Sequence, residues 1–333
     1  MNPVSVLLPT LRLDDYFFET LESLLRIDYP NLTIVVIHDF QNDHTDDLRG
    51  FEGKAAERKI ELKISHPING GLVSALNYGI SIIEDEYICR IDADDLIVSS
   101  RIRLQSTFLD ANPNVAVVGG QLQFMETNGR ITDRKSNYPI GVSETRLRLE
   151  DGCFVAHPSV MFRKSVVQSV GGYRPFFRSA EDYDLWLRIL QSYDISNLED
   201  VVTFYRQHSG QMSANTKNVD LYTRSALHSH KLRKLKITPD LPSDGESIEA
   251  WINGPILGNL WIKAFKSFNN RRISFGNFLI LKIKFTKSRG RYGAPLILLP
   301  IAMATTPLLV GREIRRFGKK CLKRITSGFF APK

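Results

Sequence analysis

The sequence predicts an α/β protein with a mostly parallel, Rossmann-like sheet and a mainly helical, basic C-terminal extension. Two short apolar runs rich in β-branched residues, VSVLLP and LTIVVI, are typical of strands covered on both faces. Segments with helical spacing of apolar residues lie between these runs and before a third run, YICRI. Strand, helix, strand, helix, strand is the doubly wound pattern, in which ligands bind beyond the carboxyl ends of the strands.

The expected elements follow one another in this order. The first strand covers residues 4–9, and the first helix starts after Asp14. The second strand covers residues 32–37, the second helix residues 70–83 and the third strand residues 87–91. The apolar stripes that predict the two helices are Phe18, Leu21, Leu24 and Leu25 in the first and Leu72, Ala75, Leu76, Gly79, Ile80 and Ile83 in the second.

Composition excludes several classes of protein. The chain has 333 residues, of which 43% are hydrophobic and 24% charged, as in a globular protein with one large or two modest domains. Its three cysteines, Cys89, Cys153 and Cys321, are far apart in the sequence, so neither a disulfide framework nor a zinc site is indicated. The first residues, MNPVSVLLPT, lack the basic stretch and long apolar run of a secretory signal. We therefore expect a reducing, cytoplasmic environment.

Charge is unevenly distributed along the chain. Residues 1–220 hold 22 Lys and Arg and 31 Asp and Glu, whereas residues 221–333 hold 22 basic and 5 acidic residues. An acidic part joined to a basic part indicates two units with different partners. The basic part should bind an anionic surface.

Polar residues follow each expected strand: Thr10, then Asp39, then the stretch DADD. In an extended chain Asp92 and Asp94 should point the same way and Asp95 the opposite way, which leaves Asp95 to fix the loop. Two carboxylates on one face can bind a hard divalent cation. The alternative is a solvated acidic loop whose last Asp starts a turn or caps a helix. Convergence of these acids at one sheet edge favours a site.

The sequence contains neither of two common nucleotide-binding motifs. No GxGxxG follows the first strand, and no GxxxxGK[ST] occurs anywhere in the chain. A bound nucleotide would have to be held in another way. A cation that bridges Asp94 and a diphosphate is one such way.

A further helix is expected at SAEDYDLWLRI, where Ser179 can cap the first turn. Glu181 and Asp182 then lie in the first turn, while Leu185 and Ile189 form the buried stripe. Acids in a first turn are favoured by the positive end of the helix dipole, by a few tenths to about 1 kcal/mol each. Periodicity alone therefore indicates a structural role for both acids.

Six separated stretches together resemble the family-2 glycosyltransferases, inverting enzymes with the GT-A fold that use nucleotide sugars. They occur in the family's order over roughly the first 210 residues: VSVLLPT, IVVIHDFQNDHT, NGGLVSALNYGI, RIDADD, HPSVMFRKSVVQSVGGYR and SAEDYDLWLRI. They resemble the opening strand, the second strand with its acidic turn, the Gly-Asn helix, the metal motif, the acceptor-side segment and the helix with the catalytic base.

The resemblance implies a donor site at the carboxyl ends of the strands. Thr10 and Asp39 would contact the nucleoside, and Asn69 and Gly70 would line the base pocket. Asp92 would face the ribose and the metal. The expected donor is a nucleoside-diphosphate sugar, most naturally a UDP-sugar.

The resemblance also implies the reacting groups. Asp94, with Asp92, would bind Mn²⁺ or Mg²⁺, and Asp182 would be the general base. An Asp works better as a base when partial burial raises its pKa above the ordinary value of about 3.9. Glu181 is the second catalytic candidate, and its alternative role is that of a capping or orienting group. His157, which opens the HPS stretch, is a candidate for contact with the acceptor or the diphosphate.

Some positions depart from the family pattern or receive no role. His38 stands where an acid is frequent, and Leu76 where an Arg is frequent, which weakens any claim that the base is uracil. Arg188 and Arg206 could reach phosphate, but an Arg on a helix is more often an ion-pair partner, and neither is assigned.

The resemblance ends near residue 215, where we place a domain boundary. Residues 1–215 form the catalytic domain, with a nucleotide-binding half over 1–110 and an acceptor and base half over 111–215. Residues 216–333 form a basic, mainly helical region that we expect to associate with a membrane.

An apolar run in the basic region supports the membrane prediction. Residues 294–310, APLILLPIAMATTPLLV, are at the short limit for a membrane span, and their three prolines disfavour a straight helix. Basic clusters flank the run on both sides, whereas a single span carries such an excess on the cytoplasmic side. We therefore expect a shallowly inserted segment whose flanks bind anionic lipids on the inner face of the plasma membrane. Apolar runs beside the basic clusters disfavour a nucleic-acid partner.

Three functions are compatible with these observations. The first is an inverting glycosyltransferase that extends a lipid-linked glycan or a surface polysaccharide. The second is a sugar-nucleotidyltransferase, which is disfavoured because no Gly-rich and basic phosphate loop follows the first strand. The third is a non-catalytic nucleotide-sugar or membrane-binding module, which the presence of Asp182 disfavours.

Overall fold

The computed structural model describes residues 1–38, 46–67, 70–211 and 216–234, with a few single positions up to residue 252. All of them belong to one compact unit, Met1–Ile256. Its elements are β1 (Val4–Thr10), α1 (Asp15–Leu25), β2 (Leu32–His38), α2 (Asp46–Glu57), β3 (Glu61–Ser65), α3 (Leu72–Ile82), β4 (Tyr87–Arg90), β5 (Leu96–Ile97), α4 (Arg101–Ala111), β6 (Val115–Met125), β7 (Ile131–Lys135), α5 (Gly141–Leu149), the 3₁₀ turn η1 (His157–Ser159), β8 (Met161–Arg163), α6 (Lys164–Ser169), α7 (Glu181–Ile189), β9 (Asp194–Arg206) and α8 (Thr216–Lys234).

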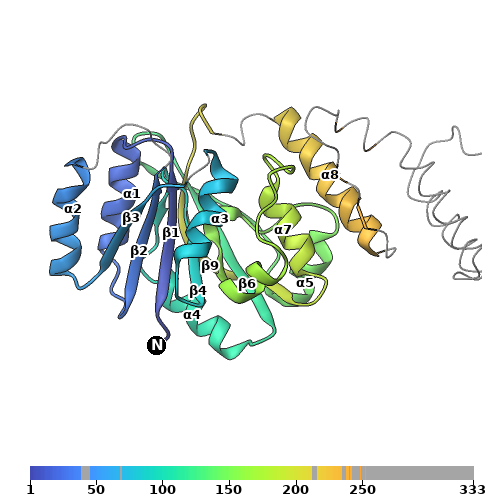
Figure 1. Ribbon diagram of the computed structural model, residues 1–333, viewed down its shortest axis with the longest axis horizontal. Coiled ribbons are helices and arrows are strands. Elements are labelled where there is room, and N and C mark those ends of the chain that lie inside the picture. The colour runs from blue at the N-terminus through green and yellow to red at the C-terminus, as the bar shows by residue number, and fades with distance from the viewer. Residues whose placement is uncertain are drawn as a thin grey trace, which may run out of the picture. The chain divides into compact units, whose positions relative to one another are not determined.

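The strands among the described residues form one mixed sheet in the order β3-β2-β1-β4-β8-β6-β9-β5, with β7 paired to β6. Figure 1 shows β3, β2 and β1 side by side in this sheet. The first four strands in this order are parallel to one another. Beyond them, β8 is antiparallel to both β4 and β6, and β9 is parallel to β6. The predicted α/β sheet is therefore confirmed, and its parallel part carries the three strand ends at which we expect ligands.

Hydrophobic layers cover both faces of the sheet. All seven residues of β1 are buried, and their side chains alternate between two clusters. Val6 and Leu8 pack in one cluster with α1, α2 and α4, whereas Leu7 packs in the other with α3 and α7. This is the two-sided burial that the run VSVLLP predicts. Asp14 caps α1 as expected, because its carboxylate accepts a hydrogen bond from the N–H of Phe17 at 3.1 Å.

The predicted element order was incomplete between β2 and α3. The structure inserts α2 and β3 there, so the parallel part has four strands rather than the three we expect. β3 lies at the edge of the sheet, and each of its five residues is exposed or only partly buried. A strand of this kind has no continuous apolar run, which is why the sequence pattern does not show it.

A buried arginine connects the parallel and antiparallel parts of the sheet. Arg101, at the start of α4, has no exposed surface, and burial lowers the pKa of its guanidinium. It donates to the carbonyl oxygens of Arg90 and Pro158, both at 2.7 Å, and of Val160 at 3.0 Å. It also donates to the Thr203 hydroxyl at 2.9 Å. A buried cation is tolerated only when its donors are used, so Arg101 holds β4, η1 and β9 in a fixed arrangement.

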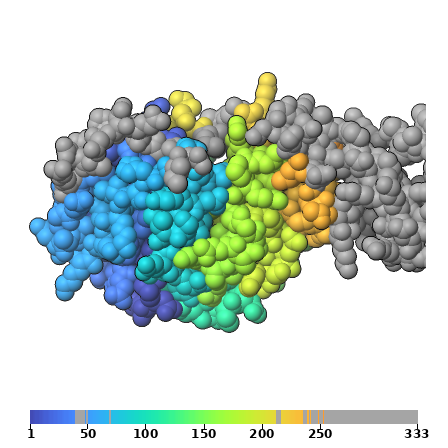
Figure 2. Space-filling view, in the orientation of Figure 1, coloured from blue at the N-terminus to red at the C-terminus, as the bar shows by residue number. Residues whose placement is uncertain are grey.

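Helix α8 packs against α7, as the adjoining orange and yellow-green surfaces in Figure 2 show. His230 lies 3.2 Å from the Leu187 carbonyl, and Arg233 lies near the buried carboxylate of Asp184. Asp184 also binds Arg188, at 2.9 Å. The boundary at residue 215 stays a prediction, although the first helix beyond it, α8, belongs to the same compact unit as α7.

Part of the membrane prediction cannot be placed on the structure. The apolar run at residues 294–310 lies outside the described residues. Among the residues that the structure does describe, no helix has both the length and the apolar character needed to cross a membrane.

Candidate active site

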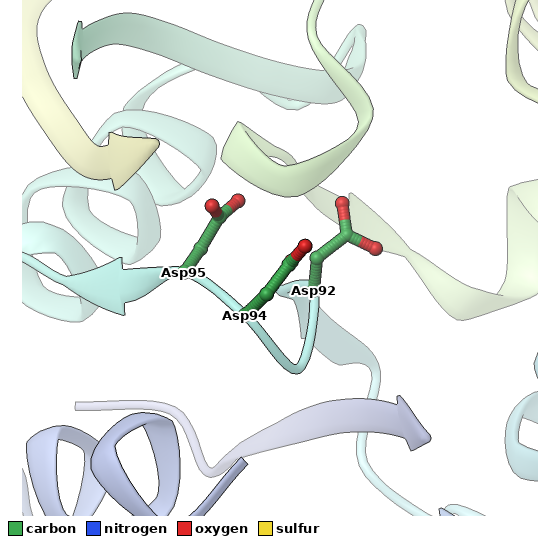
Figure 3. Close-up of side chains that lie close together, drawn as sticks. All are labelled: Asp92, Asp94 and Asp95. Carbon is green, nitrogen blue, oxygen red and sulfur yellow. The ribbon is translucent and has the colours of Figure 1, made fainter. Parts of the chain in front are cut away.

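An acidic turn follows β4 at the end of the parallel part of the sheet. The chain is not extended there as we expect, because the N–H of Asp95 bonds to the carbonyl of Asp92 at 3.3 Å and closes a turn. The alternation of faces therefore fails, and Asp95 does not point away from the other two acids. One oxygen from each of Asp92, Asp94 and Asp95 lies within 4.8 Å of the others, and Figure 3 shows the three side chains on the same turn.

Asp95 is the buried member of the cluster. Its Oδ1 accepts a hydrogen bond from the Arg206 N–H at 2.9 Å, and its carbonyl accepts from the Thr20 hydroxyl at 2.8 Å. These bonds suit the loop-fixing role that we expect. Its Oδ2, however, is buried without a hydrogen-bond partner. Burial, followed by repulsion from Asp92 and Asp94, raises the pKa of Asp95 well above its usual value.

Asp92 is held by a buried arginine from β4. Both oxygens of Asp92 accept from the guanidinium of Arg90, at 2.8 and 2.5 Å, in the two-pronged geometry typical of strong Arg–carboxylate pairs. The Arg90 side chain is only 2% exposed. Its backbone carbonyl is held in turn by Arg101. The orientation of Asp92 is thus set by the core of the protein.

Asp94 faces a histidine that sequence reasoning did not select. Nε2 of His208 lies 2.7 Å from Oδ2 of Asp94, and Nδ1 of His208 accepts from the N–H of Gly210 at 3.2 Å. A neutral imidazole in this arrangement carries its proton on Nε2 and donates to Asp94. Arg206, two residues earlier, donates to the Asp94 carbonyl at 2.8 Å and to Glu19 at 2.5 Å. The sequence gives no local signal for His208, which follows the partly buried strand β9.

These groups fit a divalent cation. Carboxylate oxygens are the ligands that Mg²⁺ and Mn²⁺ prefer, and a histidine N–H that donates to a ligating carboxylate fixes the orientation of that carboxylate. The unpartnered Oδ2 of Asp95 is a buried acceptor beside Asp92 and Asp94, and a nearby cation would satisfy it. Burial and the neighbouring Asp92 also raise the pKa of Asp94, so two adjacent charges are costly without a cation.

A second pair of acids begins helix α7. Glu181 and Asp182 are in the first turn as we expect, but Ser179 is not the cap. The residue before the helix is Ala180, which makes no capping hydrogen bond with its side chain, and Ser179 has a left-handed backbone with φ of 62°. Such a conformation is unfavourable for a residue other than glycine, and strained residues of this kind cluster at functional sites.

The folded environment of Glu181 and Asp182 disfavours the ionised form of both side chains. Burial, followed by repulsion from Asp182, raises the pKa of Glu181 to about 7. Burial also raises the pKa of Asp182, while its Oδ1 accepts from the N–H of Tyr183 at 2.7 Å. The charge of Arg90 acts on both carboxyls in the opposite direction, and Asp92 adds to the repulsion on Glu181. The acidic turn and the acid pair therefore form one electrostatic unit around Arg90.

Three remaining predicted residues are described by the structure. Thr10 ends β1 beside His38 and closes a local turn through its hydroxyl, which donates to the carbonyl of Arg12 at 2.6 Å. Gly70 is exposed just before α3. His157 is 8% exposed, and its Nε2 lies 2.8 Å from the Tyr173 hydroxyl.

The environment of His157 is that of a neutral, buried side chain. Its ring packs edge-on against Trp186, and burial lowers the pKa of the imidazole well below its usual value. Contact with diphosphate or acceptor stays a prediction for this residue. Asp39 and Asn69 lie outside the described residues.

Comparison with known proteins identifies the family. The sequence model described as Glycosyl transferase family 2 matches residues 5–171, half of the chain. This chain belongs to glycosyl transferase family 2. The predicted family and, at the level of a glycosyltransferase, the predicted enzyme class are confirmed.

This family-2 chain also resembles individual glycosyltransferases. It is 28% identical over 245 residues to the O-antigen biosynthesis glycosyltransferase WbnJ of Escherichia coli, which covers 72% of this chain and 92% of the relative. It is 31% identical over 159 residues to an uncharacterized glycosyltransferase of Haemophilus influenzae, covering 47% of this chain and 58% of the relative. The chain thus spans little more than half of that second relative.

Solved structures confirm the GT-A fold of this family-2 chain. A structure of S. aureus TarS residues 1–349 with UDP-GlcNAc has a TM-score of 0.54 and 20% identity, and the match covers 69% of this chain and 66% of that one. The mannosyltransferase PcManGT from Pyrobaculum calidifontis with GDP-Man and Mn²⁺ has a TM-score of 0.51 and 16% identity, covering 86% and 80%. At these identities the likeness concerns the fold.

Proposed function

We propose that this chain transfers a sugar, with inversion at the anomeric carbon, from a nucleoside-diphosphate sugar to a hydroxyl of a lipid-linked or polysaccharide acceptor. One observation carries the proposal. The guanidinium of Arg90 is buried and bonded to Asp92, and its charge favours the ionised forms of Glu181 and Asp182. A cation-binding group and a candidate base thus belong to one site, as a transfer from a diphosphate requires.

The donor would bind at the carboxyl ends of β1, β2 and β4. Asp92 and Asp94, with Asp95 and His208 beside them, would hold Mn²⁺ or Mg²⁺. The bound cation supplies Lewis acidity toward the diphosphate oxygens. A UDP-sugar is the first candidate donor, since TarS is solved with UDP-GlcNAc, and GDP-Man in PcManGT makes a GDP-sugar the second. Thr10, Asp39, Asn69 and Gly70 remain the proposed nucleoside contacts.

Asp182 would act as the general base. Its carboxylate would accept the proton of the acceptor hydroxyl as that oxygen attacks the anomeric carbon opposite the departing diphosphate. A raised pKa makes the carboxylate a stronger base at neutral pH than an ordinary Asp. Glu181, whose pKa is also raised, would orient Asp182 or adjust the pKa of its carboxyl group.

The proposal also covers the class of acceptor and the cellular location of the protein. The relative WbnJ is named for O-antigen biosynthesis, which supports a surface glycan as the acceptor. We place the protein at the cytoplasmic face of the membrane, held by its basic C-terminal region.

The test is nucleoside diphosphate release from a panel of nucleotide sugars, with Mn²⁺ or Mg²⁺ and a bacterial lipid extract as the acceptor source. The wild-type chain should release UDP or GDP from at least one donor, and Asp182→Asn should lower kcat by about 10²–10⁴-fold with little change in donor binding. Asp133→Asn, at an exposed position in β7, is the matched control and should retain activity. Near-normal turnover by Asp182→Asn would place the base elsewhere.

A further inference from the structure

The segment between α5 and η1 is tied to α7 at both of its ends. On one side, the hydroxyl of Tyr183 donates to the carbonyl of Leu149 at 2.7 Å. On the other side, the indole N–H of Trp186 donates to the carbonyl of Val155 at 3.3 Å. Both donors belong to the helix that begins with the proposed catalytic acids. The position of the segment relative to those acids is therefore set by the fold.

Cys153 lies between these two attachments and faces the candidate base. Its Sγ is 3.7 Å from Oδ2 of Asp182 and 3.5 Å from the carbonyl oxygen of Val155. The other carboxylate oxygen of Asp182, Oδ1, accepts from the N–H of Tyr183. Each oxygen of the base thus has one donor, and the donor at Oδ2 is a thiol.

The thiol keeps its proton at neutral pH. Although the residue is exposed, the protein atoms around its sulfur and the neighbouring Asp182 carboxylate raise the pKa of Cys153 well above its usual value. A thiol has one proton and is a weak donor, and two acceptors compete for it here. The ionised carboxylate is the stronger acceptor, whereas a protonated Asp182 leaves the thiol free to turn to Val155.

We propose that Cys153 is a positioning residue for the transfer reaction, which orients Oδ2 of Asp182 through a weak hydrogen bond to its ionised form. This inference rests on the proposed role of Asp182 as the base. A weak donor fixes the direction of the carboxylate lone pair while leaving it basic. A strong, charge-assisted donor at the same oxygen would hold the carboxylate ionised and make it a poorer base.

Other ionisable groups around Asp182 also affect its protonation. Burial, followed by repulsion from Asp182, raises the pKa of Glu181, its neighbour on α7, and the charge of Arg90 on β4 favours the ionised form of Asp182. Asp182 in turn contributes to the raised pKa of two phenols, Tyr138 and Tyr173. The thiol can be removed without changing a charge of the site or a residue of the hydrophobic core.

The experiment is the pH profile of kcat for Cys153→Ala and Cys153→Ser, measured by nucleoside diphosphate release with the donor that the wild-type chain uses. Loss of the thiol removes a bond to the ionised carboxylate of Asp182 and so raises the pKa of this base. The acid limb of the profile, where kcat falls as the base is protonated, should therefore move to higher pH by about 0.5 to 1 unit in Cys153→Ala. Cys153→Ser restores a donor, and its acid limb should return toward the wild-type position. Repeating the comparison in a Glu181→Gln background leaves Asp182 as the titrating member of the pair.

The outcomes separate this inference from the proposed function. A displaced acid limb in Cys153→Ala that Cys153→Ser reverses supports the positioning role. Equal losses of kcat at every pH in both variants, with the limb unmoved, would show that Cys153 only fills space and would overturn the inference while leaving Asp182 as the base. Full turnover by Asp182→Asn would instead defeat the proposed function and this inference with it.

Discussion

Glu181→Gln should stabilise the protein at alkaline pH while impairing its reaction. Glu181 is 5% exposed, and its pKa rises from 4.5 in the unfolded chain to about 7 in the folded one. The folded state therefore binds more protons between these values, and stability falls as pH rises through that window. At about 1.4 kcal/mol per pKa unit, the ionised carboxylate costs on the order of 3 kcal/mol above pH 7, part of which belongs to its partner Asp182. Glutamine resembles the neutral form and carries none of this cost.

The measurement is urea unfolding of the wild-type and variant chains at pH 5 and pH 8.5, in EDTA so that bound cations do not contribute. The variant's gain should be small at pH 5 and grow to about 2 to 3 kcal/mol at pH 8.5, or roughly 2 to 4 °C in Tm for each kcal/mol. Glu144→Gln is the control, because Glu144 is an exposed glutamate in the first turn of α5 and shares only the helix-end attraction. A gain that is the same at both pH values, or a loss at pH 8.5, would refute the electrostatic account of the acid pair.

Three further predictions concern other parts of the chain. His208→Gln should weaken Mn²⁺ binding in the presence of UDP by about tenfold or more, because the imidazole that faces Asp94 is lost. Titration calorimetry measures this affinity, and an unchanged value would show that His208 does not contribute to the cation site. Gly79→Ala should lower the free energy of unfolding by about 1–3 kcal/mol, measured in urea. The new Cβ would lie 2.3 Å from Leu7 Cδ1, and this clash outweighs the better helix propensity of alanine. A stabilised variant would contradict the packing of α3 on β1. Truncation after Ile256, which keeps the compact unit and α8, should move the protein from the membrane to the soluble fraction. A truncated chain that stays with membranes would show that residues 257–333 are not the anchor.

The sequence predicted those parts of the fold in which burial is continuous. β1, β2 and β4 are almost wholly buried, so their apolar runs are unambiguous. β3 was missed because an edge strand presents a polar face to solvent. The acidic turn was misjudged because alternation of faces holds only for an extended chain, and Asp95 closes a turn there.

The sequence predicted the candidate-site residues that lie in motifs. It missed those that reach the site only through tertiary contacts. Nothing local marks His208 as a partner of Asp94, since the two are 114 residues apart and meet through the packing of β9 beside the acidic turn. The sequence does indicate a role for Arg90, because a charged residue inside the otherwise apolar run YICRI must have a buried partner. Its nearest acid in the sequence, Asp92, is that partner.

Buried arginines explain how the site keeps its shape. The guanidinium of Arg90 holds the carboxylate of Asp92, and that of Arg101 holds the carbonyl of Arg90 itself. The guanidinium of Arg206 donates to the carbonyl of Asp94, and its backbone N–H donates to the carboxylate of Asp95. A buried guanidinium that loses its partners costs several kcal/mol, so the turn cannot relax without penalising the core. The acids are thus kept close together by the fold despite their mutual repulsion. A bound cation would relieve that repulsion at a site that the fold has already assembled. Substitutions of Asp94 should therefore impair donor binding while leaving the fold intact.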